Sequence, residues 1–480
     1  MPTYQVENFG CRATQADGAA LERQFEERGL DHASSEHADL VILNTCTVTV
    51  AADQDARAAI RRIRRQNPKA KIVVTGCYAQ RAPEEVGALP GVTAVIGNSH
   101  KHRLADLALL TCSRVNGQIE ADGDASRETL AGAFVPLAAL SHESGDRGIA
   151  SEIFVSDIFA HSELLAAPVF DGKATGLHGE QRTRPNLKVQ DGCDNRCSFC
   201  VIPYVRGQSR SLSPDHVLRE VHGQVAAGFR EVVISGINLG RWGRDLASAG
   251  MSKLTFEDLI RAILNETALE KLRISSVEPM DWSDELIRLV AESPRIAKHA
   301  HVPLQSGSDP VLRRMHRKYR PWHYREKIEK IRAAMPGAAI GADVMVGFPG
   351  ETDAEFNVTR RFIEELAFTY LHVFTYSARP GTPAADLPNQ VPVHIARERN
   401  RILREIAQGK KLRFMHSFVG RTVEAITLGA DGSEHHGEMF TEALTDNYLK
   451  LHLIGHHASN RWMKIEVTEV EENALVGEAR

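Results

Sequence analysis

A cluster of three cysteines is the clearest chemical feature of the sequence. Cys193, Cys197 and Cys200 have the spacing C-x3-C-x2-C in a chain with only 7 cysteines among 480 residues. A structural zinc ion takes four ligands, and no other cysteine follows Cys200. Three thiolates better suit a four-iron cluster that keeps one iron open for a small molecule. The spacing therefore predicts a metal centre with a vacant coordination position.

Three further cysteines each follow a predicted strand. Cys11, Cys46 and Cys77 come after apolar stretches at 4–6, 40–43 and 72–74. Because parallel strands bring their carboxyl ends to one edge of a sheet, we expect these cysteines to converge. Free cysteines are often small buried hydrophobic residues. Their equivalent positions nevertheless favour a second site of three thiolates, whereas Cys112 is expected only to pack.

Strand and helix patterns alternate along the parts of the sequence that contain both cysteine triads. They predict an α/β protein with several domains. Residues 1–110 indicate a parallel α/β sheet domain, with helices expected at 16–28 and 51–66. Residues 111–185 have weak periodicity and are interpreted as a linker or insertion. Six strand–helix units in 186–410 predict a partial (β/α)6 barrel with ligands at the strand carboxyl ends. Short alternating runs in 411–480 predict a small all-β barrel.

Composition excludes several classes of protein. Hydrophobic content is 42%, charged content is 25% and the net charge is −4, as in ordinary globular proteins. The sequence has no apolar run of 18 residues and no charged-then-apolar leader, so neither a membrane span nor a secretory signal is expected. A cytoplasmic location follows, where thiols stay reduced and metal ligation is favoured over disulfides.

The motifs resemble those of a known family. The C-x3-C-x2-C segment with Phe199 before its last cysteine resembles the radical S-adenosylmethionine (SAM) signature. Five further motifs resemble those of the methylthiotransferase family more specifically. They are NTCTVT at 44–49, VTGCYAQ at 74–80, VQDGC at 189–193, LQSGS at 304–308 and VGFPGE at 346–351. The resemblance covers nearly the whole chain and implies a methylthiotransferase domain, a radical SAM barrel and a C-terminal TRAM domain.

Details of the motifs distinguish branches of that family. The segments 44–53 and 235–240 (SGINLG) most resemble the branch that acts on N6-threonylcarbamoyladenosine beside the tRNA anticodon. The isopentenyladenosine branch usually has Gly-Gln-Asn where this chain has Gly236-Ile237-Asn238. The member acting on an aspartate of ribosomal protein S12 is similar in its cysteines but not in these segments. A non-catalytic iron–sulfur protein that binds RNA or transfers electrons, and a zinc-bound structural module, remain as alternatives.

The resemblance also implies a chemistry. Cys193, Cys197 and Cys200 would hold a [4Fe-4S] cluster that binds SAM, whose cleavage gives a radical able to abstract hydrogen from adenine C2. Cys11, Cys46 and Cys77 would hold a second [4Fe-4S] cluster that carries the sulfur to be transferred. The electron donor and the sulfur source stay unknown. Weaker candidates for SAM contacts are Phe199, Ser235, Gly236, Ser276 and Glu278, although a lone Ser or Glu there can equally be a helix cap.

Contacts to a tRNA anticodon stem–loop are expected from two basic groups. Arg57, Arg61, Arg64 and Arg65 fall near one face of the helix at 51–66, and Arg317 and Lys318 belong to a basic run. Each group alone is also typical of an ordinary solvated face. The segment 411–480 has 7 Lys and Arg against 11 Asp and Glu, which predicts a poor phosphate binder.

Overall fold

The computed structural model describes residues 2–115, 151–161, 183–249, 253–429, 433–435 and 438–480. The chain divides into two compact units. The first comprises Met1–Pro168 and Val201–Gln208, and the second comprises Val169–Cys200 and Ser209–Arg480. The chain therefore enters the first unit a second time immediately after Cys200. Most of the expected 111–185 insertion lies outside the described residues.

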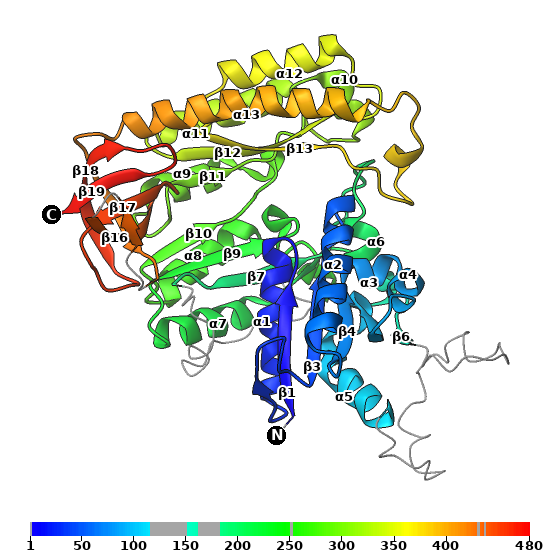
Figure 1. Ribbon diagram of the computed structural model, residues 1–480. Helices are drawn as coiled ribbons and strands as arrows, with labels where there is room; N and C mark the ends of the chain where they lie inside the picture. The colour runs from blue at the N-terminus through cyan, green and yellow to red at the C-terminus, as the bar shows by residue number, and fades with distance from the viewer. Residues whose placement is uncertain (1, 116–150, 162–182, 250–252, 430–432, 436–437) are drawn as a thin grey trace. The chain divides into compact units, whose positions relative to one another are not determined.

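The first unit is built on a parallel sheet (Figure 1). Its strands are β1 (Thr3–Asn8), β2 (Asp31–His32), β3 (Leu40–Thr45), β4 (Lys71–Gly76), β5 (Val92–Gly97) and β6 (Glu152–Phe154). They pair in the order β2-β1-β3-β4-β5-β6, and every pairing is parallel. The predicted parallel α/β domain is confirmed, and β6 adds an edge strand from the segment interpreted as a linker.

Helices cover this sheet and enclose two apolar clusters. They are α1 (Arg12–Glu26), α2 (Val50–Gln66), α3 (Cys77–Arg81), α4 (Pro83–Gly87) and α5 (Leu104–Val115), with 3-10 turns η1 (Asn98–Arg103) and η3 (Ile158–Ala160). The short helix α6 (Ile202–Arg206) packs on α3 instead. Thr49 caps α2, because its hydroxyl accepts a hydrogen bond from the Ala52 amide at 3.1 Å. Ile60 and Ile63 of α2 are buried against Val41 and Val74 of the sheet, so burial of one apolar face stabilises the helix.

The second unit contains a barrel of parallel strands (Figure 1). Its strands are β7 (Asn186–Asp191), β9 (Glu231–Gly236), β10 (Lys271–Ile274), β11 (His299–His301), β12 (Ala339–Val346) and β13 (Tyr370–Thr375), with β8 (Arg210–Ser211) antiparallel at the edge beside β7. Continuous pairing joins β7, β9 and β10 and also β11, β12 and β13. Isolated parallel bridges, one of them from Ser276 to His301, link the two sets. The predicted partial barrel of six strand–helix units is confirmed.

Helices follow the barrel strands. They are α7 (Pro214–Ala226), α8 (Phe256–Glu266), α9 (Asp284–Glu292), α10 (Asp309–Arg314), α11 (Pro321–Ala334), α12 (Asp353–Glu365) and α13 (Val393–His416), with 3-10 turns η4 (Leu239–Arg241), η5 (Leu246–Ala249), η6 (Pro279–Asp281) and η7 (Pro383–Asp386). Thr255 with Asp258, and Thr352 with Glu355, form capping boxes that fix the starts of α8 and α12. In Figure 1, α12 and α13 lie along one side of β12 and β13.

The chain ends in a closed antiparallel barrel with one parallel pairing. Its strands are β14 (Thr422–Thr427), β15 (Ser433–His435), β16 (Glu438–Thr445), β17 (Lys450–Ile454), β18 (Trp462–Val470) and β19 (Leu475–Ala479). The strands pair in the order β14-β18-β19-β17-β16, and the barrel closes through the pairing of β14 with β16. The short strand β15 pairs antiparallel with β16. Leu451, Leu453, Ile465 and Val467 are fully buried inside it. This barrel matches the predicted TRAM-like fold.

Candidate metal centres

The first unit brings Cys11, Cys46 and Cys77 to one edge of its sheet. Cys46 and Cys77 directly follow β3 and β4, and Cys11 directly precedes α1 after the end of β1. Since β1, β3 and β4 are neighbours in the parallel sheet, their carboxyl ends deliver the three thiols to the same place. The predicted convergence of these cysteines is therefore present.

Close backbone approach accompanies this convergence. A Cβ on Gly10 would lie 2.5 Å from Cβ of Cys46, so the residue before Cys11 must be a glycine for the two loops to meet. Burial and the neighbouring Cys77 and Cys11 thiols raise the pKa of Cys46 to about 12. A free Cys46 would thus stay protonated at neutral pH. A bound metal centre is what would deprotonate it, because metal ligands must be thiolates.

The loop of Cys193, Cys197 and Cys200 runs from β7 toward α6 and is held by backbone contacts. Ser198 donates its amide to the Met315 carbonyl at 3.1 Å and its hydroxyl to the Arg314 carbonyl at 2.7 Å. The Ala384 amide donates in turn to the Ser198 carbonyl at 2.8 Å. A turn closed by the Cys200 amide on the Cys197 carbonyl places the last two cysteines together.

Hydrogen-bond donors surround the sulfurs of this loop. The Asn195 amide lies 3.4 Å from Sγ of Cys193, and Nδ2 of Asn238 lies 3.7 Å from the same sulfur. Nη1 of Arg317 lies 3.2 Å from Sγ of Cys197. Hydrogen bonds to sulfur are one of the means by which proteins set iron–sulfur potentials. Sequence reasoning did not assign these roles to Asn195, Asn238 or Arg317.

The spacing of the sulfurs bears on the kind of metal. A single zinc ion with Zn–S bonds of about 2.3 Å needs its sulfurs about 4 Å apart. Among the described residues, one group of three potential ligands has all its ligand atoms within 4.8 Å of one another, and that group contains no cysteine. Both triads are therefore more open than a mononuclear zinc site. Three thiolates with hydrogen bonds to sulfur fit a multi-iron cluster instead.

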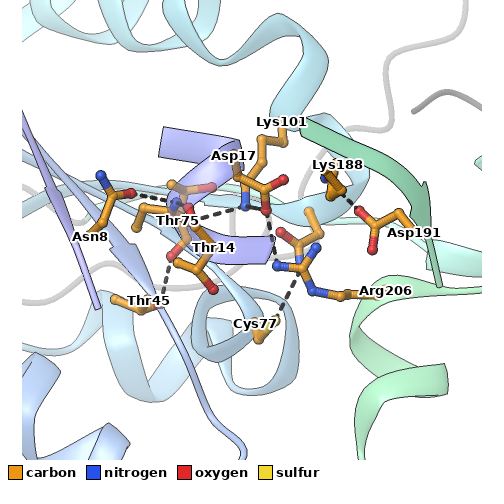
Figure 2. A network of polar contacts seen from close by, with 12 residues as sticks. Asn8, Thr14, Asp17, Thr45, Thr75, Cys77, Lys101, Lys188, Asp191 and Arg206 are labelled. Atoms are coloured by element: carbon orange, nitrogen blue, oxygen red, sulfur yellow. Dashed lines mark hydrogen bonds and ion pairs between the residues drawn. The ribbon is translucent and has the colours of Figure 1, made fainter. Parts of the chain in front are cut away.

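A buried ion network lies in the first unit and includes a residue from α6 (Figure 2). Nζ of Lys101 is 3.0 Å from Asp17 and 3.1 Å from Oδ1 of Asn44, and Nη2 of Arg206 is 2.9 Å from Asp17. The three charged side chains are at most 5% exposed. The Arg206 charge lowers the pKa of Cys46 against the larger effect of burial.

The segment 201–208 also contacts Cys77, one of the three cysteines of the first unit. Cys77 packs with Val201 and Val205, and Asn98 donates to the Val205 carbonyl at 2.8 Å and to Sγ of Cys77 at 3.6 Å. Val201 follows Cys200 in the chain. The residues that directly follow Cys200 in the chain therefore pack against Cys77.

The residues predicted to contact SAM have mixed surroundings. Phe199 lies edge-on to Phe348, with ring centroids 6.5 Å apart. Ser235 is buried, and its hydroxyl has no hydrogen-bond partner in the described chain. A Cβ on Gly236 would lie 2.9 Å from Oε1 of Gln190, so this position has no room for a side chain.

Ser276 and Glu278 pair with other side chains. The Ser276 hydroxyl lies 2.7 Å from Nδ1 of His301, and Glu278 forms an ion pair with Arg317. Glu278 lines a small cavity with Cys197, Arg241 and Lys318. Glu278 therefore lies beside Cys197, whereas the Ser276 hydroxyl is hydrogen-bonded to His301.

The predicted RNA contacts separate into exposed and engaged side chains. Arg61, Arg64 and Arg65 on α2 are exposed, as is Lys318. Arg57 instead donates to Tyr78 at 2.7 Å and pairs with Glu85. The expectation for Arg317 has to be corrected. Its side chain is only 6% exposed and points at Cys197 and Glu278, so its guanidinium is not available to a phosphate.

Comparisons with known proteins agree with this architecture. Residues 3–97 match the "Uncharacterized protein family UPF0004", and residues 187–363 match the "Radical SAM superfamily". A radical SAM methyltransferase, TsrM from Kitasatospora setae, superposes with a TM-score of 0.55 at 16% identity, over 80% of this chain and 74% of that chain. That likeness concerns the fold. No helix in the described part of the chain is long and apolar enough to span a membrane.

Relatives in sequence are nearer. The threonylcarbamoyladenosine tRNA methylthiotransferase MtaB of Bacillus subtilis is 35% identical over 94% of this chain and 90% of its own length. MtaB of Rickettsia prowazekii is 34% identical over 98% and 96%. The tRNA-2-methylthio-N(6)-dimethylallyladenosine synthase of Thermobifida fusca is 33% identical over 90% and 78%.

The parallel barrel and the C-x3-C-x2-C loop define a radical SAM enzyme, and this fold implies SAM and a [4Fe-4S] cluster. With its second cysteine triad and near-full-length relatives, the chain belongs to the methylthiotransferase family of radical SAM enzymes.

Proposed function

We propose that the chain transfers a methylthio group to C2 of N6-threonylcarbamoyladenosine at position 37 of tRNA. The observation that carries this proposal is full-length similarity to relatives bearing that name. MtaB proteins of five organisms match 88–99% of this chain at 32–35% identity. We place the reaction in the cytoplasm, with a one-electron donor and a sulfur source supplied from outside.

We assign the cofactors by the two cysteine triads. Cys193, Cys197 and Cys200 would hold one [4Fe-4S] cluster, and Cys11, Cys46 and Cys77 a second. When bound, the clusters and SAM supply the radical chemistry and the sulfur that an unactivated aromatic C–H bond requires. The chain's own part is to hold the sulfurs in place. Asn195, Asn238 and Arg317 donate hydrogen bonds to them.

The inner face of the barrel favours a polar substituent on the adenine. His301, Asp343 and His372 lie together on β11, β12 and β13. Ligands of such barrels bind at the strand carboxyl ends, and His301 is the last residue of β11. A hydrocarbon group such as dimethylallyl would remove these polar atoms from water without offering hydrogen bonds, which costs free energy. A threonylcarbamoyl group offers a carboxylate, a hydroxyl and amides.

Dimethylallyladenosine remains the second candidate, because synthases of that class are 32–33% identical to this chain. Their match covers 55–78% of their own length, less than for the MtaB relatives. Contact with the nucleic acid is assigned to Arg61, Arg64, Arg65 and Lys318, which are exposed.

The test is nucleoside analysis by mass spectrometry after the cluster-loaded enzyme meets tRNA that lacks methylthio groups, with SAM, reductant and sulfide. We expect 2-methylthio-N6-threonylcarbamoyladenosine and 5′-deoxyadenosine, and neither from Cys193→Ala. A methylthio group only on dimethylallyladenosine would select the second candidate. Unmodified tRNA with methylthiolated ribosomal protein S12 would move the target to protein. Absence of 5′-deoxyadenosine would indicate a non-catalytic iron–sulfur protein that binds RNA.

A further inference from the structure

A second kind of ligand cluster lies inside the barrel, on three neighbouring strands. His301 ends β11, Asp343 lies within β12 and His372 within β13. Asp343 is directly opposite His372 in the strand pairing, and Gly341, two residues before Asp343, is opposite His301. Because alternate residues of a strand share a face, all three side chains lie on one face of the sheet.

Distances agree with the register. One nitrogen of each histidine and one oxygen of Asp343 all lie within 4.8 Å of one another. Nε2 of His301 is 3.4 Å from Oδ1 of Asp343, and the imidazole centroids of His301 and His372 are 5.6 Å apart. Among the described residues, this is the one group of three His, Cys, Asp or Glu side chains with such spacing.

His301 has the surroundings of a metal ligand. It is only 7% exposed, and its buried Nε2 makes no hydrogen bond in the described chain, with Oδ1 of Asp343 beside it at 3.4 Å. Its other ring nitrogen, Nδ1, is 2.7 Å from the Ser276 hydroxyl. In the tautomer whose Nδ1–H donates a hydrogen bond to the Ser276 oxygen, Nε2 keeps its lone pair. Outer-shell partners of this type fix the tautomer and orientation of metal-bound histidines.

Charge and exposure complete the argument. The cluster places one carboxylate between two imidazoles, so a cation is attracted rather than repelled. Asp343 is half-buried and His372 is exposed, which leaves room at the cluster for further ligands. Two imidazoles with one carboxylate suit first-row transition ions better than calcium or magnesium, which prefer oxygen ligands.

We propose that His301, Asp343 and His372 bind one divalent transition-metal ion, such as Zn²⁺, in a site without cysteine ligands. Three adjacent, hydrogen-bonded strands provide a rigid frame for such a site. Its open positions would take an oxygen or nitrogen donor from a molecule in the barrel. The proposal does not depend on which adenosine is the substrate.

The test is equilibrium dialysis of the full, cluster-loaded chain against Zn²⁺, with bound zinc measured by mass spectrometry. Cluster-loaded protein is used so that the cysteines are already occupied. We expect about one tightly bound zinc ion per wild-type chain. His372→Ala should lose it, and because His372 is exposed, this variant should fold. His394→Ala, which removes an exposed histidine on α13, is the matched control and should keep it.

Two further variants separate metal binding from an ordinary hydrogen-bonded cluster. Asp343→Asn keeps the shape but removes the charge, and should abolish the tight site. Ser276→Ala removes only the partner of Nδ1 and should weaken zinc affinity by about 10- to 100-fold. The proposal is overturned if wild type binds no more zinc than His372→Ala, or if Asp343→Asn binds zinc as tightly as wild type.

Discussion

Arg206 and Asp17 are 189 residues apart in the sequence, yet Nη2 of Arg206 lies 2.9 Å from Oδ2 of Asp17 in the interior of the first unit. Asp17 is shared, since Lys101 also binds it at 3.0 Å. The shared carboxylate ties Arg206 of α6, six residues beyond Cys200, to α1, which begins at the residue after Cys11. It therefore joins the segment that follows Cys11 to the segment that follows Cys200.

Removing this carboxylate should destabilise the first unit more than removing either cation. Asp17→Asn removes the carboxylate that both buried cations, Lys101 and Arg206, contact, at a cost of about 3–5 kcal/mol. Arg206→Met should cost less, because Asp17 keeps Lys101. Native-state hydrogen exchange of α1 and β3 measures the opening free energy. A larger loss in Arg206→Met than in Asp17→Asn would contradict this ranking.

A second buried pair connects the radical SAM barrel to the C-terminal barrel. Arg273 and Glu231 are both fully buried, and Nε of Arg273 lies 2.6 Å from Oε1 of Glu231. Arg273 also donates to the carbonyls of Thr445 and Asp446 and lies over the Tyr448 ring, 5.4 Å from its centroid. Strand β17 thus follows a tight turn whose residues pack on the neighbouring domain.

Arg273→Met should destabilise the second unit by about 3–5 kcal/mol, because it leaves Glu231 buried without its main partner. The double variant Glu231→Leu with Arg273→Met should recover part of that loss. Denaturant titration followed by tryptophan fluorescence tests this, since Trp242 and Trp462 lie in the second unit. Equal stability of the single and double variants would show that the unpaired charge of Glu231 is not the cause of the destabilisation.

The same pair gives a pH dependence. Burial raises the pKa of Glu231, but Arg273 and Arg184 outweigh it and hold the pKa below its usual value. A carboxyl group with a lowered folded-state pKa stabilises the fold above its unfolded value of about 4.3. This contribution should be complete at neutral pH and be lost as the pH falls through the lower folded-state value.

Binding of tRNA should depend on salt through α2. Each neutralised phosphate of a single strand contributes about 0.7 to the slope of log affinity against log salt. Replacing exposed Arg61, Arg64 and Arg65 by alanine should therefore reduce the slope by about 2. Arg62→Ala is the matched control, because Arg62 pairs with Glu7 and should change the slope little. Unchanged slopes in the triple variant would remove α2 from the RNA-binding surface.

The features that could be predicted from the sequence are those that depend on local patterns of residues. Both cysteine triads, the parallel sheet and the barrel follow from spacing and from alternation of apolar residues, which are local properties. The strand expected at 40–43 extends over Leu40–Thr45, directly up to Cys46, and the helix expected at 16–28 begins earlier, at Arg12. Its N-cap is Cys11, which makes no side-chain cap hydrogen bond, so no capping residue in the sequence marks this boundary.

The remaining features depend on contacts between distant segments. Arg317 belongs to a basic run that predicts a solvated surface, but the turn at 315–319 buries it against Cys197. Lys101, Asp17 and Arg206 come from three separate elements, and His301, Asp343 and His372 from three strands. Pairing of this kind is set by tertiary register rather than by local sequence. A lone histidine in a strand gives no signal of its partners.

The most direct test of two independent three-thiolate sites is the iron content of the reconstituted protein. Wild type should hold about eight iron atoms per chain, and Cys193→Ala and Cys46→Ala about four each. The combined variant should hold almost none, and Cys112→Ala, which removes a cysteine that packs beside the apolar core, should keep about eight. Four iron atoms in wild type, with no loss in Cys46→Ala, would contradict a second cluster at Cys11, Cys46 and Cys77.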